Sequence, residues 1–363
     1  MNPETTPIAA HNRSHPVLAV SLGDMNGVGP EVVLKALSGD LRHEAGFQLF
    51  GPATVLEYYA NLMGIPHFWQ DVQKNSPDDS SESGDVDGFA VPKPGEVFLY
   101  PSSEPEEGIQ PGFISAEAGA FAMQAVSAGV LACQSGRADA LVTAPISKEA
   151  IQKAGYQVPG HTEYLAELTR TRDAGMLLVN DTMRIGLATI HIPVRDIAGH
   201  LTTELIDRQL ALFFETLRSA FGIPDPHIAV LGLNPHAGDG GVIGDEEQRI
   251  IEPAVAKFRE RGHQISGPWP ADGFFGSGGH KNADMVLAMY HDQGLIPLKL
   301  SGFNKGVNVT AGLPVIRTSP DHGTAFAIAG KNQADAGSMR EAIALAITMI
   351  NRKNKAQTGN KSG

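Results

Sequence analysis

The sequence has very little cysteine, since Cys133 is the only one in 363 residues. A single cysteine excludes an internal disulfide framework, a cysteine-based zinc ribbon and an iron–sulfur cluster held by this chain alone. It is typical of a protein from a reducing compartment. The sequence also lacks an uninterrupted apolar run of about 20 residues, and no basic start followed by an apolar stretch opens it. We therefore expect a cytoplasmic protein with no membrane partner.

Positive charge is scarce as well. Lys plus Arg number 28 against 40 Asp plus Glu, which gives a formal net charge of -12 at pH 7. This balance disfavours a general affinity for nucleic acid, because such proteins carry a basic surface that neutralises phosphates. An anionic ligand would therefore have to be met by a local cationic pocket.

Several catalytic motifs are absent. Six residues separate the glycines around Gly323 and Gly330 where a phosphate-binding loop requires four, and Asn332 stands where Ser or Thr would bind magnesium. The chain has no G-x-S-x-G elbow, no H-E-x-x-H, and no P-C-x-x-C to accompany His161 and Glu163. P-loop nucleotidases, serine hydrolases, zincin proteases and zinc deaminases are therefore disfavoured.

What the chain does contain is an ordinary globular composition, with 42% hydrophobic and 19% charged residues, at a length that suits about two domains. Short β-rich runs alternate with amphipathic helical ones: VLAVSLGD then PEVVLKAL, ALVTAP then ISKEAIQKAG, IAVLGLNP then EEQRIIEPAVAKFRERG. This alternation predicts an α/β fold with a mostly parallel sheet and helices on both faces. Residues 202–221 and 334–351 are expected to be helices, and the acidic stretch 70–88 a mobile surface loop.

Three histidines stand at matched positions. The apolar runs IGLATI, IAVLGL and MVLAMY each reach a histidine within three residues of their end, at His191, His236 and His291. In an open α/β sheet the carboxyl ends of parallel strands face a common crevice, so these imidazoles can converge there. Three nitrogen ligands with an open position suit a catalytic Zn²⁺ or a similar divalent ion. Asp292 can orient the neighbouring imidazole or serve as an ordinary loop carboxylate.

A second group of residues is suited to binding an anion. Lys299 supplies a point charge, Arg317 a bidentate fork and Asn308 a neutral donor and acceptor, which together fit a phosphate or a carboxylate. Thr162 opens an apparent helix, where it can cap the helix or help to hold an anion. Asp272 is a possible carboxylate partner or an ordinary turn residue. The glycine-rich turn at residues 23–31 is either a tight βα turn or a loop that approaches an anion.

Together these residues resemble the 4-hydroxythreonine-4-phosphate dehydrogenase family of pyridoxal phosphate biosynthesis, part of the wider isocitrate and isopropylmalate dehydrogenase fold group. The first glycine loop departs from the usual GDPAGIGPE of the family at Met25 and Asn26, and FAIAGK replaces the usual FDIAGK near the family's dinucleotide site. The resemblance covers nearly the whole chain and rests on GDMNGVGPEV, LVTAPISKEAI, GHTEYLAE, HIPVRDI, GLNPHAGDGGVIGDEE, PADGFF, YHDQGLIPLK and GVNVTAGLPVIRTSPDHGTAF.

The resemblance implies two α/β/α domains with a cleft between them, and a homodimer whose active site is shared between the subunits. It implies a divalent metal, Zn, Mg or Co, and either NAD or NADP as cofactor. The metal ligands would be His191, His236 and His291, the substrate contacts His161, Thr162, Lys299, Asn308 and Arg317, and the catalytic groups Lys299 and Asp272.

The implied reaction is oxidation of the C3 hydroxyl of 4-phosphooxy-L-threonine, followed by decarboxylation to 3-amino-2-oxopropyl phosphate. Either Lys299 or an ordered water takes the proton. The alternatives are a sister dehydrogenase acting on 4-phospho-D-threonate, 4-phospho-D-erythronate or a cyclic diol carboxylate, and a non-catalytic metal-dependent anion-binding protein. A titration with NAD⁺ would separate the last of these from an enzyme.

The expected domain limits follow partly from the family. Residues 16–149 with 319–352 are expected to form the first domain, and residues 150–318 the second, which would carry the metal and substrate residues. The polar ends, residues 1–15 and 353–363, are expected to be disordered.

Overall fold

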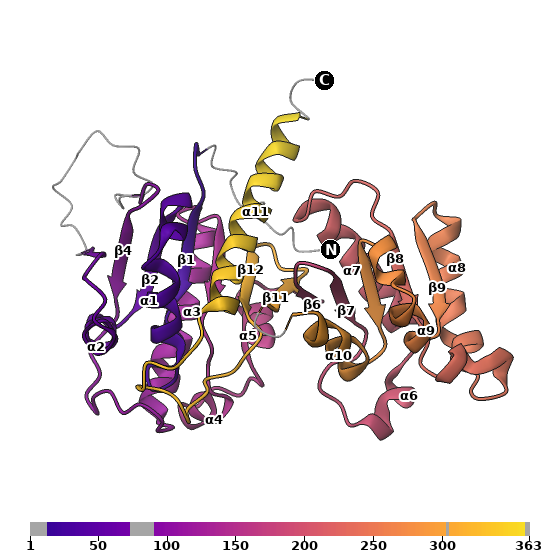
Figure 1. The fold of residues 1–363 in the computed structure, drawn as a ribbon, viewed down its shortest axis with the longest axis horizontal. Helices are drawn as coiled ribbons and strands as arrows, with labels where there is room; N and C mark the ends of the chain where they lie inside the picture. The colour runs from indigo at the N-terminus through magenta and orange to yellow at the C-terminus, as the bar shows by residue number, and fades with distance from the viewer. Residues whose placement is uncertain (1–12, 73–90, 303–304, 360–363) are drawn as a thin grey trace. The chain divides into compact units, whose positions relative to one another are not determined.

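The computed structural model describes residues 13–72, 91–302 and 305–359. The chain divides into two compact units, drawn in Figure 1: unit 1 comprises Met1–Thr171 with Leu313–Asn351, and unit 2 comprises Arg172–Gly312 with Arg352–Gly363. Each unit has a β-sheet with helices packed on it, so the predicted α/β class is confirmed. This division assigns residues 150–171 to unit 1, whereas the sequence analysis assigned them to the second domain.

The sheet of unit 1 is parallel throughout its described part. Its strand order is β3-β4-β2-β1-β5-β12, with every neighbouring pair parallel. The order reverses at β1, which lies between β2 and β5, and ligands of open α/β sheets bind at such a point. The strand bounds are β1 Val17–Ser21, β2 Gly46–Gly51, β3 Gln70–Asp71, β4 Val97–Pro101, β5 Ala140–Thr143 and β12 Ile316–Pro320.

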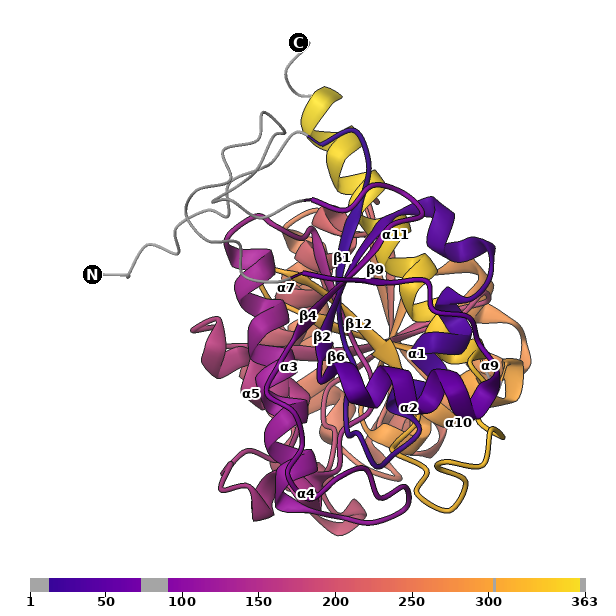
Figure 2. The same cartoon turned by 90° about the vertical axis from the view of Figure 1, so that its left-hand side faces the viewer.

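Helices cover both faces of the sheet in unit 1. Figure 2 shows α3 on one face and α1 with α2 on the opposite face, as expected for strands connected by helical crossovers. The bounds in this unit are α1 Gly29–Leu37, η1 Asp40–Glu44, α2 Ala53–Met63, α3 Ala116–Gln134, α4 Lys148–Lys153, α5 His161–Leu168 and α11 Gly337–Gly359.

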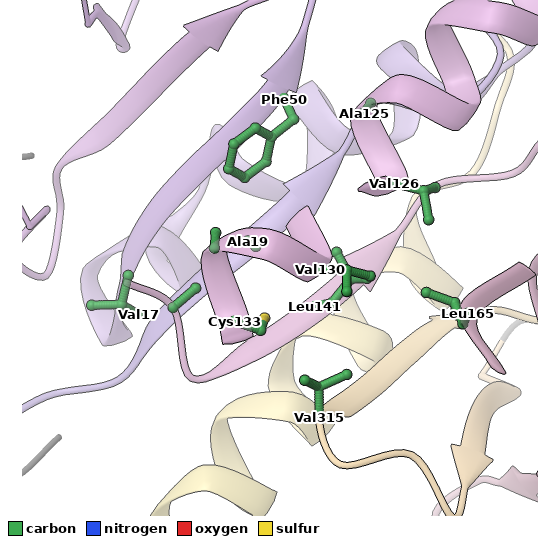
Figure 3. Packing of buried hydrophobic residues seen from close by; sticks show 12 residues of the cluster. Val17, Ala19, Phe50, Ala125, Val126, Val130, Cys133, Leu141, Leu165 and Val315 are labelled. Atoms are coloured by element: carbon green, nitrogen blue, oxygen red, sulfur yellow. The ribbon is translucent and has the colours of Figure 1, made fainter. Parts of the chain in front are cut away.

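The helix α3 packs closely on the sheet (Figure 3). Its residues Val126 and Val130 are buried in one cluster with Ala19 of β1 and Leu141 of β5. A Cβ at Gly129 would lie 2.6 Å from Leu141 Cδ1, so a glycine is needed for this close approach. α3 is also long and apolar enough to cross a membrane by length and composition, but 61% of its apolar window is buried inside the protein, as in a core helix.

The sheet of unit 2 is mixed. Its strand order is β11-β6-β7-β10-β8-β9; β6 pairs antiparallel with β11 and with β7, and the remaining pairs are parallel. The predicted mostly parallel sheet is therefore interrupted here by a hairpin. The strand bounds are β6 Gly175–Val179, β7 Arg184–Leu187, β8 Ile228–Leu231, β9 Ile265–Trp269, β10 Met285–Ala288 and β11 Val307–Ala311.

Two helices of unit 2 pack on opposite faces of β7. Gly186 faces Phe213 of α7, whereas its neighbours Ile185 and Leu187 face Gly294 of α10. Successive residues of a strand point to opposite faces, so the sheet is covered on both sides. The bounds are η2 Val194–Asp196, α6 Ile197–His200, α7 Thr203–Ser219, η3 Pro235–Gly241, η4 Glu247–Ile251, α8 Glu252–Glu260, α9 Ala271–Gly276, η5 Gly279–Asn282 and α10 His291–Ser301.

The predictions of disorder need correction where the structure describes the chain. α11 continues to Gly359, because the Lys, Ala and Gln residues after Ile350 favour a helix once its packed part has formed. At the other end, Arg13 lies 3.6 Å from Asp139, so residues 13–15 are not disordered. Residues 70–71 form β3, while residues 1–12, 73–90 and 360–363 lie outside the described residues.

Candidate active site

The three predicted metal ligands follow three neighbouring strands. β7, β10 and β8 are adjacent and parallel, so their carboxyl ends lie at the same edge of the sheet. His191 and His291 are close together, with ring centroids 5.8 Å apart and ring planes tilted by 40°. The spacing of these histidines after apolar runs therefore predicted a real proximity for two of the three.

His291 is the first residue of α10 and is oriented by its neighbour. Its Nδ1 lies 2.7 Å from Asp292 Oδ1, so the carboxylate accepts the Nδ1 proton and Nε2 is the nitrogen left for a ligand. Of the two roles that the sequence left open for Asp292, this contact favours orientation of the imidazole. Acceptors of this kind fix the tautomer of a metal-binding imidazole and raise its basicity.

His236 lies in a strained turn. Five consecutive residues, 236–240, have φ between 45° and 81°, and three of them, His236, Ala237 and Asp239, are not glycine. A left-handed conformation costs about 1–2 kcal/mol for each residue with a Cβ. Strain of this kind persists where the surrounding structure enforces it, and it is typical of functional sites.

A buried carboxylate holds this turn in place. Glu247 is 1% exposed, and its Oε1 accepts hydrogen bonds from the backbone N–H groups of Leu233 (2.7 Å) and Asn234 (2.8 Å). Its Oε2 accepts a third from Asn234 Nδ2 (3.0 Å). Sequence reasoning missed this residue, since a glutamate at the start of a charged helical stretch resembles an ordinary solvent-exposed one.

The donor set fits a divalent metal in its chemistry but is incomplete among the described residues of one chain. Three imidazoles suit Zn²⁺ and related ions, and His191 and His236 are exposed. Among residues 13–72, 91–302 and 305–359, however, no group of three His, Cys, Asp or Glu side chains is placed to hold a metal ion. Two of the three predicted metal ligands, His191 and His291, are therefore close together in this structure, and His236 is not grouped with them.

Unit 1 contains a buried cationic group. Arg317 on β12 is 1% exposed, and its Nε (3.1 Å) and Nη2 (2.6 Å) both donate to Thr143 Oγ1 at the end of β5. Burial lowers the pKa of Arg317 to about 9, so the side chain is still positive at pH 7. A buried guanidinium with donors in a planar fork favours an anionic ligand.

His161 lies beside this guanidinium. Burial of its ring, and then the charge of Arg317, hold the pKa of His161 well below its usual range, so the imidazole is neutral. Its Nε2 is inaccessible to solvent and has no hydrogen-bond partner in the part of the chain that the structure describes. A buried polar atom without a partner is unusual and is expected where a ligand supplies the missing bond.

The remaining predicted residues occupy separate places. Thr162 is not a helix cap, because α5 begins at His161 and its N-cap is Gly160, with no side-chain bond. Asn308 lies on β11 of unit 2, and its buried Oδ1 has no partner among the described residues. Lys299 lies in the last turn of α10, and Asp272 is exposed in the first turn of α9.

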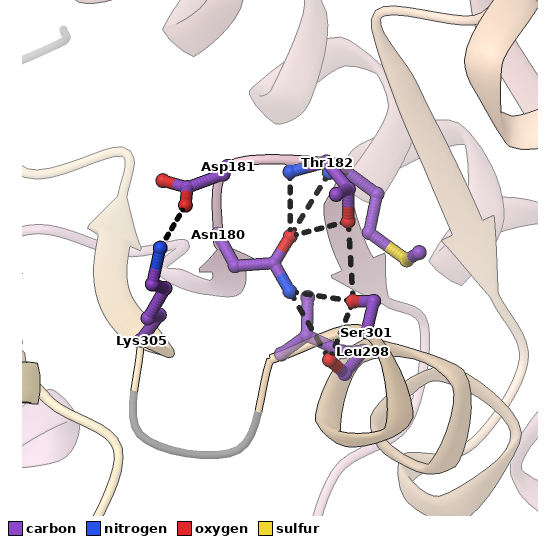
Figure 4. Close-up of polar contacts among 7 residues, drawn as sticks. Asn180, Asp181, Thr182, Leu298, Ser301 and Lys305 are labelled. Atoms are coloured by element: carbon purple, nitrogen blue, oxygen red, sulfur yellow. Dashed lines mark hydrogen bonds and ion pairs between the residues drawn. The ribbon is translucent and has the colours of Figure 1, made fainter.

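A polar cluster fixes the backbone around Lys299 (Figure 4). Asn180, in the turn between β6 and β7, donates from Nδ2 to Leu298 O (3.1 Å) and to Ser301 Oγ (2.7 Å). Its Oδ1 accepts a hydrogen bond from the backbone N–H of Thr182 (2.9 Å). Because Lys299 lies between Leu298 and Ser301, the cluster holds the helix end that carries this lysine.

The glycine-rich loop after β1 is buried and firmly tied. Gly23 has a φ of 72°, and a Cβ there would lie 2.4 Å from Pro145 O, so only glycine fits. Asn26, one of the two departures from the family pattern, accepts a hydrogen bond at Oδ1 from the backbone N–H of Gln110 (2.7 Å). Met25, the other departure, is buried, and its carbonyl accepts a hydrogen bond from Tyr59. Hydrogen bonds thus hold this loop where the family pattern has proline.

Asp24 is the second functional candidate that sequence reasoning did not single out. It is fully buried, Oδ1 accepts a hydrogen bond from Asn26 N (2.9 Å), and Oδ2 has no partner in the described part of the chain. Burial raises the pKa of Asp24 from 3.8 to about 6, although the backbone N–H groups of Asn26 and Gly27 oppose this change. Perturbed carboxyl groups of this kind cluster at functional sites.

Asp24→Asn is expected to stabilise the protein at pH 8. The folded state holds the Asp24 proton more tightly than the unfolded state, so wild-type stability falls as the pH rises from about 4 to about 6 and the loss is complete above that range. The difference between the folded and unfolded pKa values of Asp24 corresponds to about 3 kcal/mol of folding free energy. Asparagine keeps the acceptor for Asn26 N and carries no charge.

Urea unfolding at pH 4 and pH 8 measures this difference, with Asp71→Asn as the exposed control in the same unit. The variant should gain stability at pH 8 and very little at pH 4. An equal loss of stability at both pH values would contradict the interpretation, because it would mean that folding does not change the pKa of Asp24.

Comparison with known proteins agrees with the resemblance found in the sequence. A family model described as pyridoxal phosphate biosynthetic protein PdxA matches residues 45–346. A 4-hydroxythreonine-4-phosphate dehydrogenase of Prosthecochloris aestuarii is 42% identical over 347 residues, which cover 90% of this chain and 95% of that protein. The chain belongs to the PdxA family. It is accordingly an oxidoreductase of pyridoxal phosphate biosynthesis.

Solved structures of dehydrogenases share the fold. The crystal structure of a 4-hydroxythreonine-4-phosphate dehydrogenase from Klebsiella pneumoniae is 38% identical, with a TM-score of 0.81, and the match covers 94% of this chain and 99% of that one. A terephthalate 1,2-cis-dihydrodiol dehydrogenase from Burkholderia xenovorans is 30% identical, with a TM-score of 0.62 and coverage of 92% and 98%. Dehydrogenases named for different substrates therefore share this fold.

Proposed function

We propose that this protein oxidises the C3 hydroxyl of 4-phosphooxy-L-threonine with NAD⁺ or NADP⁺, giving 2-amino-3-oxo-4-phosphooxybutanoate. This β-keto acid loses CO₂ to give 3-amino-2-oxopropyl phosphate. The observation that carries the proposal is the buried guanidinium of Arg317 in unit 1 beside His161, whose solvent-inaccessible Nε2 has no partner among the described residues; together they offer a positive fork and an imidazole nitrogen to an anionic substrate. Relatives at 42% identity are named for this dehydrogenase activity.

The proposed substrate contacts are the five residues predicted from the sequence. In unit 1 these are His161, Thr162 and Arg317, and in unit 2 they are Lys299 and Asn308; their side chains suit phosphate, carboxylate and hydroxyl groups. Asn308 suits this role because its buried Oδ1 has no partner among the described residues. The buried donors give the bound phosphate charge-assisted hydrogen bonds, which are stronger than neutral ones.

The oxidation moves a hydride from C3 to the nicotinamide ring and a proton from the C3 hydroxyl to a base. Lys299 or an ordered water accepts that proton, and Asp272 is the second candidate catalytic group. His191, His236 and His291 would hold a divalent ion, Zn, Mg or Co, which supplies Lewis-acid stabilisation of developing negative charge on substrate oxygen. For the nicotinamide cofactor, the reversal of strand order between β1 and β5 is the place in unit 1 typical of ligand binding.

We also propose that the protein is a cytoplasmic homodimer whose metal and substrate residues come from both subunits. Val194 and Val242, which follow His191 and His236 in the chain, are 77% and 83% exposed, and Leu300 beside Lys299 is 84% exposed. Exposed apolar side chains beside a site are typical of an interface. The incomplete metal set among the described residues of one chain supports a shared site.

An assay of NADH or NADPH formation tests the proposed function. The purified, metal-replete protein is given 4-phosphooxy-L-threonine, 4-phospho-D-threonate or 4-phospho-D-erythronate, with each cofactor, before and after treatment with EDTA. A marked preference for the amino acid that is lost with the chelator is the expected result. Activity that survives removal of the metal would contradict the proposed role of the histidines.

The alternative function is a sister dehydrogenase that acts on 4-phospho-D-threonate, 4-phospho-D-erythronate or a cyclic diol carboxylate. The structural relative named for a dihydrodiol substrate, at 30% identity, supports keeping this alternative. A preference for a substrate without the amino group in the same assay would establish it, with the same metal and the same type of reaction.

A further inference from the structure

A chain of hydrogen bonds joins the carboxyl ends of four strands in unit 2, and it passes through two side chains, those of Thr189 and Gln293. Thr189 Oγ1, after β7, donates to Met289 O, after β10 (2.7 Å). Met289 N donates to Gln293 Oε1 (2.7 Å), and Gln293 Nε2 donates to Gly232 O, after β8 (2.7 Å). Gly232 N in turn donates to Trp269 O at the end of β9 (2.8 Å). We refer to these five residues as the strand-end chain.

Each backbone member of the strand-end chain stands just before a residue of the proposed site. The backbone of β7, β8, β9 and β10 is therefore linked at the positions from which the proposed ligands and the candidate carboxylate extend. In order along the chain, Thr189 precedes His191, Gly232 precedes His236, Trp269 precedes Asp272 and Met289 precedes His291, each by two to four residues.

Part of what Gln293 does is ordinary helix capping. Gln293 is the third residue of α10, and a glutamine or glutamate there commonly reaches back to a backbone N–H before the helix, as its Oε1 does to Met289 N. The bond from Nε2 to Gly232 O is different, because it leaves the helix and reaches another strand. Capping does not require this second bond, so it calls for a separate explanation.

The first turn of α10 is held tightly enough for Gln293 to act as a fixed link. A Cβ at Gly294 would lie 2.6 Å from Ile185 Cγ2, so the glycine allows the helix to lie directly against β7. Thr189 is also buried, at 6% exposure. A link between buried, closely packed elements transmits position, because such elements cannot shift without loss of packing.

We propose that Gln293 is a positioning residue that holds the His236 turn in place relative to the strand ends that carry His191 and His291, so that the histidines each subunit contributes to the shared site bind the divalent ion with full affinity. The proposal rests on the metal site of the proposed function. Its physical basis is that metal affinity depends on holding ligands at the required separation, and groups that orient ligands change affinity about 10–100-fold when mutated.

Gln293→Glu separates positioning from capping. Glutamate keeps an oxygen for Met289 N and is itself a common capping residue, but it has no hydrogen to donate to Gly232 O. The dissociation constant for Zn²⁺, measured against a competing chelator, is expected to rise about 10–100-fold, while the midpoint of thermal unfolding of the metal-free protein changes little. Gln264→Ala, at an exposed position of the same unit, is the control.

A second pair of variants tests the other arm of the strand-end chain. Thr189→Val removes the hydroxyl that donates to Met289 O, whereas Thr189→Ser keeps it. The backbone N–H of Thr189 also donates to Met289 O (3.2 Å), so the valine variant is expected to weaken Zn²⁺ binding less than Gln293→Glu does, and the serine variant to bind it as the wild type does. Hydrogen exchange of the metal-free protein should show faster exchange at residues 233–241 in Gln293→Glu.

The outcomes distinguish this inference from the function on which it rests. If wild-type protein binds Zn²⁺ through the three histidines and Gln293→Glu binds it equally well, the positioning role is overturned and the proposed function stands. If wild-type protein binds no divalent ion, or His191→Ala leaves its affinity unchanged, both the metal site and this inference are overturned.

Discussion

His236→Ala is expected to abolish metal binding and turnover together. The imidazole is the proposed ligand after β8, and its removal leaves two nitrogen ligands where a catalytic divalent site needs three. The dissociation constant for the metal should rise by more than about 100-fold. Mutating a group that only orients a ligand raises it by up to about 100-fold, and the loss of a ligand itself should have a larger effect. Loss of Lewis-acid stabilisation should lower kcat by about a thousandfold. Metal content by elemental analysis and kcat on the same preparations measure both effects.

The strained turn at His236 allows a second substitution to test the same prediction. His236→Gly removes the Cβ that makes a φ of 55° costly, so this variant should be more stable than the wild type by about 1 kcal/mol although it is inactive. His263→Asn, at the opposite end of the same sheet, where the ring packs against Phe214, serves as a control that should retain its metal. A His236→Gly protein with normal activity and metal content would show that the turn is strained for some other reason.

Arg317→Lys is expected to lower kcat/KM for the phosphorylated substrate about 100-fold, mainly through KM. Lysine keeps the charge but loses the planar fork, of which Nε and Nη2 bond to Thr143. Losing a buried, charge-assisted contact to an anion costs about 2–5 kcal/mol, a range that includes the expected change of about 100-fold in kcat/KM. Initial rates over a range of substrate concentrations separate KM from kcat.

An exposed arginine provides the matched control for this substitution. Arg208 is 56% exposed and lies 3.8 Å from Asp173, so Arg208→Lys should leave kcat/KM unchanged. Inorganic phosphate should raise the thermal unfolding midpoint of the wild type and of Arg208→Lys but not that of Arg317→Lys. An Arg317→Lys enzyme with wild-type kcat/KM would remove Arg317 from the substrate site.

The placing of the histidines shows how far sequence reasoning reaches. Apolar runs of strand length followed by His191, His236 and His291 predicted imidazoles at the carboxyl ends of strands, and the structure confirms that these strands are neighbours. The pattern did not reveal that His236 enters a left-handed turn, because a histidine in a loop carries no sign of its φ angle. The Glu247 carboxylate that bonds to the residues just before this turn is buried, and that burial is a property of the folded chain.

The residues that hold the site were harder to find than those that form it. Gln293 and Asn180 are single amides in ordinary sequence surroundings, and nothing local indicates that one bonds to Gly232 and the other to Leu298. Their partners are distant in sequence and become neighbours only through the packing of α10 on the sheet. Thr162 shows the opposite error: because threonine is typical of helix caps, it was predicted as a possible cap, but the helix begins at His161 and its N-cap is Gly160.

The sequence by itself determined the α/β class and the family, and it predicted the chemical character of the site, because periodicity, strand-end histidines and a few basic residues in an acidic chain are properties of residue type and order. The tertiary structure decided which side chains have pKa values shifted from their usual range. Burial lowers the pKa of His161 and of Arg317 and raises that of Asp24, and the depth of a side chain depends on what the rest of the chain packs against it. Hydrogen bonds between residues far apart in sequence likewise form only when folding brings their strands together.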